Sequence, residues 1–192
     1  MNNHIETRTP LGSTALVTDP AVAGIFGFAL CCLSVGMNLS FPLMKNVPVA
    51  GFGLVAGGVL QLLGGLAAWS RGQETASVAF CAAGLFFLSL LPVMVFPEFG
   101  LGIAPDRMTL GSYLVMWALF FGIMTPGLRR HCPALALPTV LQCGALTLFT
   151  LALAVDHAPL ARIGGAMFLG AGLVTSLAII AGIFRNGSAP LR

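Results

Sequence analysis

The chain has 192 residues, of which 57% are hydrophobic and only 8% are charged, and its formal net charge is +3. A water-soluble domain carries roughly 25% charged residues, so this chain lacks the charge to cover a soluble surface, and a lipid bilayer is its natural solvent. The composition excludes a soluble enzyme module. The small positive charge forms no basic stripe of the kind that binds nucleic acid.

The first residues, 1–19, are polar and contain neither the short apolar core nor the small-residue cleavage site of a signal peptide. We therefore expect a cytoplasmic N-terminal tail. Asp19 stands directly before Pro20, where the first apolar segment begins. This order is typical of a helix N-cap followed by proline at the first helical position.

Six apolar segments follow, each close to the roughly 20 residues that a helix needs to cross a bilayer. They cover residues 22–40, 47–69, 76–96, 109–127, 133–155 and 163–184, and proline or glycine combines with charge in the turns between them. The alternation of a membrane β-barrel is absent. The sequence predicts one all-α integral membrane domain over residues 20–185, with six transmembrane helices and a C-terminal tail at 186–192.

Basic residues are divided unequally between the two sides of this arrangement. The side of the termini holds Arg8, Arg71, Arg129, Arg130, Arg185 and Arg192, and the other side holds Lys45, Arg107 and Arg162. Cytoplasmic loops are enriched in Lys and Arg. We therefore expect a multi-pass protein of the cell (inner) membrane with both termini in the cytoplasm.

Polar residues inside the spans are few. Ser34 and Asn38 are four residues apart on span one, where they could line a pathway or join two helices. On span two, Gly53, Gly57 and Gln61 recur every four residues and share one face. The two glycines form a GxxxG pattern that favours close helix packing. For Gln61, either an interhelical hydrogen bond or a pore-lining donor fits this position.

The positions of the aromatic residues and the cysteines predict how these side chains pack. Tyr113 and Trp117 share one face of span four, and we expect both to pack, with interfacial anchoring possible for Tyr113. Four phenylalanines are expected on lipid-facing or subunit-facing surfaces: Phe86, Phe87, Phe120 and Phe121. The five cysteines show no CxxC spacing, so we expect buried small side chains and no metal site.

Histidines and carboxylates lie away from the middle of the spans. The three histidines and six carboxylates fall in the tail, in loops or at span ends, so we expect no catalytic set and no cofactor. Proton pumps usually carry an ionisable relay inside the membrane. Without one, a proton must travel on the substrate, along water, or past Asp19 and Glu74 at the cytoplasmic rim. This favours a channel, a facilitator, or a weak acid that carries its own proton.

Four motifs in register with the predicted spans resemble the acetate uptake transporter family (SatP/YaaH type). The opening "DPAVAGIFGF" is similar to the family's NPAPLGLxGFG, and span two keeps Gly57, Gly58, Gln61, Gly65 and Gly72 of GGxxQxxAGxxExxxG. The stretch "TLGSYLVMW" is similar to FLGxYLxxW, and Gly165 and Gly172 match a glycine pair in span six.

The resemblance implies a six-helix protomer that assembles into a homohexamer, with a pathway for small monocarboxylates such as acetate in each protomer. It places the constriction at Phe28, Ala83 and Gln142, and a size-selecting position at Thr175. Together with this pathway we expect Gln61 and Asn38 as polar neighbours, Asp19 and Glu74 at the cytoplasmic entrance, and helix packing through Gly53, Gly57, Gly58, Gly65, Gly165 and Gly172.

Two constriction positions depart from the family pattern. Ala83 replaces a tyrosine, which opens volume, and Gln142 replaces a leucine, which adds an amide that both donates and accepts hydrogen bonds. Thr175 adds a hydroxyl. We expect a solute larger or more hydroxylated than acetate, unless Gln142 points into the bundle. Two other functions stay open: a passive channel for small neutral polar solutes, and a non-transporting membrane scaffold.

Overall fold

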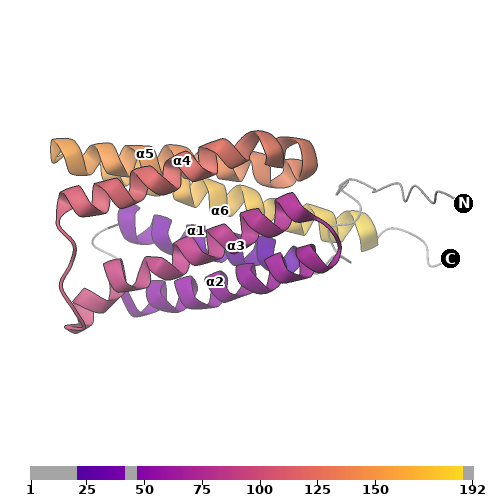
Figure 1. Cartoon of the computed structure of the whole chain (residues 1–192), viewed down its shortest axis with the longest axis horizontal. Coiled ribbons are helices and arrows are strands. Elements are labelled where there is room, and N and C mark those ends of the chain that lie inside the picture. Colours follow the sequence, from indigo (N-terminus) through magenta and orange to yellow (C-terminus); the bar gives the residue numbers. More distant parts are fainter. Residues whose placement is uncertain (1–20, 42–46, 188–192) are drawn as a thin grey trace, which may run out of the picture.

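Six long helices run roughly along one axis in the computed structural model, which describes residues 21–41 and 47–187 (Figure 1). They are α1 (Ala21–Ser40), α2 (Val47–Ser70), α3 (Glu74–Ser89), α4 (Arg107–His131), α5 (Pro133–Val155) and α6 (Ala158–Gly187). A π-helical turn, η2 (Leu91–Val95), and a 3-10 turn, η3 (Phe96–Phe99), complete the third span. Pro92 lies in η2 and lacks the N–H that regular α-helical bonding needs.

All six spans are long and apolar enough to cross a membrane, which confirms the predicted all-α membrane fold. Helix α6 is longer than the sixth span expected at 163–184, since it starts at Ala158 and continues to Gly187. The expected tail at 1–19, with its proposed cap Asp19, lies outside the described residues.

The helices form a ring of neighbours. Helix α1 packs on α2 and α6, α5 packs on α4 and α6, and α2 packs on α3, whereas α3 and α4 make few close backbone contacts. Aromatic rings fill the seam between α3 and α4: the ring centroid of Phe86 lies 5.3 Å from that of Trp117 and 5.7 Å from that of Phe121. Large side chains therefore bridge a separation that the backbones leave open.

The burial of the rings at this seam contradicts the prediction that the four phenylalanines lie on lipid-facing or subunit-facing surfaces. Phe86 and Phe87 are fully buried and Phe121 is 3% exposed, while Phe120 is only partly buried. The surface assignment was wrong for three of the four. A transmembrane helix is apolar on every face, so hydrophobicity does not separate its lipid side from its core side.

Small residues allow the tightest helix contacts. A Cβ atom added to Gly57 would lie 2.6 Å from the carbonyl oxygen of Gly27, and one added to Gly64 would lie 2.6 Å from the backbone nitrogen of Gly24. Helices α1 and α2 therefore pack backbone to backbone, as small residues permit in membranes. An added Cβ would also come within 3.0 Å of a neighbouring helix at each of the glycines expected to pack: Gly53, Gly57, Gly58, Gly65, Gly165 and Gly172.

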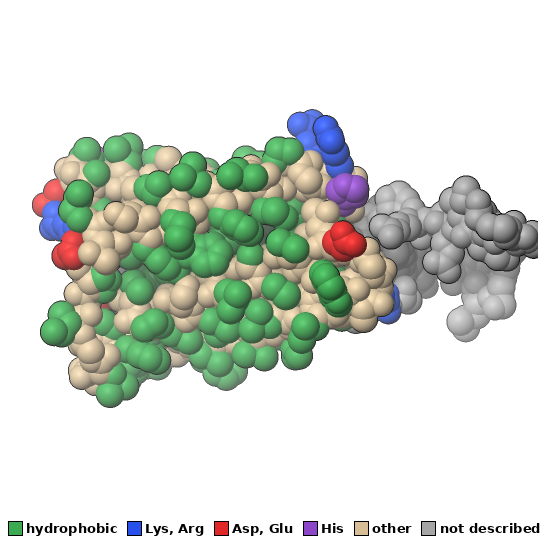
Figure 2. Space-filling model, in the orientation of Figure 1, with side chains coloured by type: hydrophobic (Ala, Val, Ile, Leu, Met, Phe, Trp, Pro, Cys, Tyr) green, Lys and Arg blue, Asp and Glu red, His purple; other side chains and the backbone are tan. Residues whose placement is uncertain are grey.

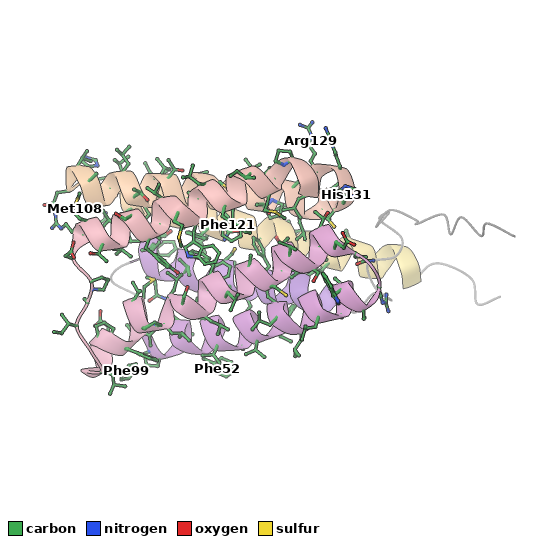
Figure 3. All side chains as sticks on the ribbon, in the orientation of Figure 1. Phe52, Phe99, Met108, Phe121, Arg129 and His131 are labelled. Carbon is green, nitrogen blue, oxygen red and sulfur yellow. The ribbon has the colours of Figure 1, made fainter. Side chains whose placement is uncertain are left out.

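Apolar side chains cover the length of the bundle, and charged side chains gather at its two ends (Figure 2). Arg129 and His131 mark one end, and Phe99 and Met108 mark the other (Figure 3). This distribution matches the hydrocarbon core and the two aqueous faces of a bilayer.

Candidate functional site

A narrow cavity lies inside the bundle, enclosed by α1, α3, α4 and α5. Its volume is about 10 Å³, and its walls are Phe28, Ala79, Phe80, Ala83, Phe121, Leu128, Leu135, Thr139 and Gln142. The structure thus brings together Phe28, Ala83 and Gln142, the three residues placed at the constriction by resemblance. A volume of this size holds about one water molecule, so the cavity itself has no room for a larger solute.

Gln142 is the most polar side chain of the cavity. Helix α5 begins with Pro133 at its first position, where a missing N–H is harmless, and Gln142 follows in the middle of the helix. The side chain is fully buried. Within the described part of the chain, neither its Nε2 nor its Oε1 has a hydrogen-bond partner. A buried amide in this state is destabilising unless a ligand or water satisfies it.

Phe28 forms a rigid part of the wall. Its side chain is 4% exposed, and its ring meets the edge of Phe87 at a centroid distance of 6.1 Å and an interplanar angle of 79°. Phe87 in turn contacts Phe168 on α6 at 6.5 Å. Edge-to-face pairs of this kind hold the rings in one orientation.

Gln61 lies between α1 and α2 and is not among the residues that line the cavity. Its Nε2 donates to the Sγ of Cys31 at 3.4 Å, and the side chain is fully buried. Its Oε1 has no partner among the described residues. Of the two interpretations of Gln61, this contact favours the interhelical hydrogen bond.

Thr175 and Glu74 also lie away from the cavity lining. Thr175 is fully buried, and its hydroxyl donates to the carbonyl oxygen of Ala171 in its own helix at 2.7 Å. Glu74 is exposed at the first residue of α3, and Asp19 lies outside the described residues.

A second cavity, here called the vestibule, lies where α1 ends and α2 begins. Its volume is about 260 Å³, and its walls are Ser34, Val35, Asn38, Leu39, Val47, Ala50, Leu54, Met94 and Val95. The Nδ2 of Asn38 donates to the carbonyl oxygen of Ser34 at 3.0 Å. The vestibule is larger than the inner cavity, and Ser34 and Asn38 make part of its wall polar.

The described residues contain no candidate metal centre. No group of three or more His, Cys, Asp or Glu side chains there is placed to hold a metal ion. None of the five cysteines, all of which lie within the described ranges, forms a disulfide: Cys31, Cys32 and Cys132 are buried, and Cys81 and Cys143 are partly buried.

Sequence reasoning missed several cavity residues. Thr139 precedes Gln142 by three positions, which places both on one face of a helix, so a search for polar pairs on α5 would have found it. Phe121 was assigned to the surface. Phe80 and Leu128 carry no sequence signal that distinguishes them from other apolar residues.

A bundle of six apolar spans with a buried polar side chain at an internal cavity is compatible with a multi-pass membrane transport protein. The model of the GPR1/FUN34/yaaH family matches residues 7–191. The chain belongs to this family, a family of transporters, which confirms the resemblance found in its sequence motifs.

Two relatives illustrate the similarity. The succinate-acetate/proton symporter SatP of Escherichia coli (strain K12) is 31% identical over 111 residues, which cover 57% of this chain and 58% of the relative. An uncharacterized protein of Methanothermobacter thermautotrophicus is 27% identical over 113 residues, or 55% of each chain. Both alignments span little more than half of either protein.

The solved structure of the bacterial acetate channel SatP has the same fold. The two structures superpose with a TM-score of 0.80 over 91% of this chain and 97% of the other, at 21% sequence identity.

Proposed function

We propose that this chain moves small organic acids across the cell membrane through a pathway inside each protomer. The observation that carries the proposal is the internal cavity at which Phe28, Ala83 and Gln142 meet. A protein that only served as a scaffold would gain nothing from a buried, unpaired amide at that point. The relatives named for acetate and succinate support the same class of solute.

In this proposal the solute crosses the vestibule and then the constriction. Ser34 and Asn38 meet it first, and Phe28, Ala83 and Gln142 form the narrow neck. Gln61 and Thr175 line neither cavity, and we expect them to reach the solute only when the bundle opens. Asp19 and Glu74 would stand at the cytoplasmic mouth.

The neck favours a solute larger or more hydroxylated than acetate. A purely apolar neck favours compact, poorly hydrated solutes, whereas Ala83 leaves space and Gln142 offers a donor and an acceptor. We therefore expect lactate or succinate to cross at least as fast as acetate when the three undissociated acids are compared at equal concentration.

Uptake into proteoliposomes tests both parts of this proposal. Acetate, lactate, succinate and urea are offered separately, and protein-free liposomes give the rate of simple diffusion. Acetate winning by a wide margin contradicts the preference for larger or hydroxylated acids. A protein that moves none of the four solutes contradicts transport itself.

A passive channel for small neutral solutes is the second candidate. Its support is the position of the described carboxylates, Glu74, Glu98, Asp106 and Asp156, all of which lie at helix ends or in loops. Such a channel would pass urea at a rate that an imposed pH gradient does not change. Uptake that follows the pH gradient would favour the acid transporter.

We further propose that both termini face the cytoplasm and that the protein is a homohexamer of the cell membrane. The orientation follows from the basic residues, and the hexamer follows from family resemblance. Native mass spectrometry in detergent would test the second point, with six chains in one particle as the expected result.

A further inference from the structure

The amide of Gln142 is the starting point, because the described chain satisfies neither of its polar atoms. The cavity beside it is about 10 Å³, so at most about one water can occupy it. A primary amide presents one acceptor and two donors. When the neck widens to admit a solute, this side chain is therefore free to bind it.

The remaining wall of the cavity offers no charge to a solute. All lining side chains other than Gln142 and Thr139 are hydrocarbon. The Thr139 hydroxyl donates to the carbonyl oxygen of Leu135 at 2.7 Å, so toward the cavity it offers only an acceptor. A carboxylate anion at this point would lose its hydration without gaining a cation, which is strongly unfavourable.

An undissociated carboxylic acid complements the amide. Its carbonyl oxygen accepts from the Nε2 of Gln142 while its O–H donates to the Oε1, so two hydrogen bonds form side by side. A carboxylate has acceptors only, and one of its oxygens would face the Oε1 of Gln142 in repulsion. The pairing thus distinguishes the two protonation states of one solute.

We propose that Gln142 selects small carboxylic acids in their undissociated form at the neck. This inference rests on the proposed function and adds the species that crosses. The acid takes its proton from water at one mouth and returns it to water at the other, so one proton and one carboxylate cross together and no net charge moves. Coupling to protons then needs no titratable residue within the spans.

The test measures uptake of radiolabelled acetic acid into proteoliposomes that carry a pH-sensitive dye inside. External pH is varied, a membrane potential of either sign is imposed with valinomycin and potassium, and protein-free liposomes give the baseline. Protein-dependent uptake should acidify the lumen, ignore the potential, and fall about tenfold per pH unit above the pKa of the acid. Acetamide, a neutral compound with the same donor and acceptor pattern, should compete.

Three variants assign the effect to the amide. Gln142→Met keeps the shape but loses both hydrogen bonds, so acid uptake should fall about tenfold and competition by acetamide should disappear. Gln142→Glu keeps a donor and an acceptor while burial holds its carboxyl protonated, so it should retain uptake at low external pH. Thr147→Val is the control on α5, because the exposed Thr147 bonds only the carbonyl of Cys143 in its own helix.

The outcomes separate the two proposals. Uptake driven by a positive interior, or a Gln142→Met protein that behaves as the wild type, overturns the selection of the undissociated acid but leaves transport intact. If Gln142→Met fails to assemble, the response of Gln142→Glu and of the wild-type protein to potential and acetamide decides alone. A wild-type protein without any solute flux overturns the proposed function and this inference together.

Discussion

The role of each glycine in this bundle depends on the atoms that lie within a few ångströms of it. Gly27 and Gly57 bring the backbones of α1 and α2 together. Gly122 on α4, by contrast, has no atom within 4 Å of where a Cβ would stand. The same residue type is therefore essential for packing at one position and replaceable at another.

Gly27→Ala should lower the free energy of unfolding by roughly 1–3 kcal/mol, because the new methyl group meets the backbone of α2. Gly122→Ala should be neutral or stabilising by up to about 1 kcal/mol, since alanine is the better helix former. Thermal unfolding of the detergent-solubilised protein measures both. Equal losses in the two variants would contradict the close approach of α1 and α2.

From the sequence we could name candidate residues for the site, but we could not predict which of their polar atoms find hydrogen-bond partners. The spacing of Gly53, Gly57 and Gln61 indicated a close-packed face, and the family resemblance, without a motif in span five, placed Gln142 at the constriction. Which amide finds a partner depends on the residues opposite: Cys31 faces Gln61, whereas the cavity wall near Gln142 is hydrocarbon apart from Thr139. Neither of two distant helices determines by itself which residues of the other lie opposite it. The sequence pattern therefore could not show that Gln61 has a partner and Gln142 has none among the described residues.

At the scale of helices, the seam between α3 and α4 differs from the other contacts of the ring. Glycines join α2 to α1 and α3, whereas aromatic rings join α3 to α4. The attachment of α4 on this side therefore depends on a few large side chains, with Phe86 at their centre.

Phe86→Ala should cost about 3–5 kcal/mol of stability, because Phe86 is fully buried and contacts four other aromatic rings. Phe52→Ala is the matched control, since Phe52 is 74% exposed on the outside of α2 (Figure 3), and it should change stability little. Thermal unfolding followed by tryptophan fluorescence compares the two. A Phe52 variant as unstable as the Phe86 variant would show that the seam has no special role.

A titratable side chain, Asp106, caps the start of α4. Asp106 caps the helix and accepts from the backbone N–H groups of Met108 and Thr109 and from the Thr109 hydroxyl at 2.9, 3.0 and 2.6 Å. These bonds, led by that of the Thr109 side chain, hold the pKa of Asp106 below its usual value.

The cap should be fully effective above the unfolded pKa of about 3.9 and should weaken as pH falls through the lower folded value. Amide hydrogen exchange at Met108 and Thr109 should accelerate in that acidic range, and in Asp106→Ala it should be fast at every pH. Exchange that stays slow in Asp106→Ala would rule out the cap.

Span positions were predictable because hydropathy and length depend only on local composition. The start of α6 was placed five residues too late (163 against Ala158), since Pro159 and Arg162 look like loop residues although a first helical turn tolerates both. The η2 turn was not predicted, because it depends on how the residues around Pro92 meet the bundle. The direction of Phe86 and Phe121 depends likewise on tertiary packing.

For the whole molecule, the two ends differ in charge. Among the described residues, Arg71, Arg129 and Arg130 lie at one end, whereas Arg107, which pairs with Asp156 at 2.7 Å, and Arg162 lie at the other. The excess of basic residues at the first end supports a cytoplasmic location for it.

Cysteine labelling in intact cells tests this orientation. Gly102→Cys, in the exposed loop before α4, should react with a membrane-impermeant maleimide, whereas Arg130→Cys should react only after the cells are opened. The wild-type protein gives the background from its own five cysteines. The opposite labelling pattern would invert the proposed topology.

The tightness of the inner cavity has a physiological consequence. Protons hop readily along a continuous file of hydrogen-bonded waters, but a space of about 10 Å³ walled mainly by hydrocarbon interrupts any such file. If solutes cross at this cavity, as proposed above, the resting neck is too small for a continuous file of waters, and we expect proteoliposomes with the protein to leak protons no faster than protein-free liposomes.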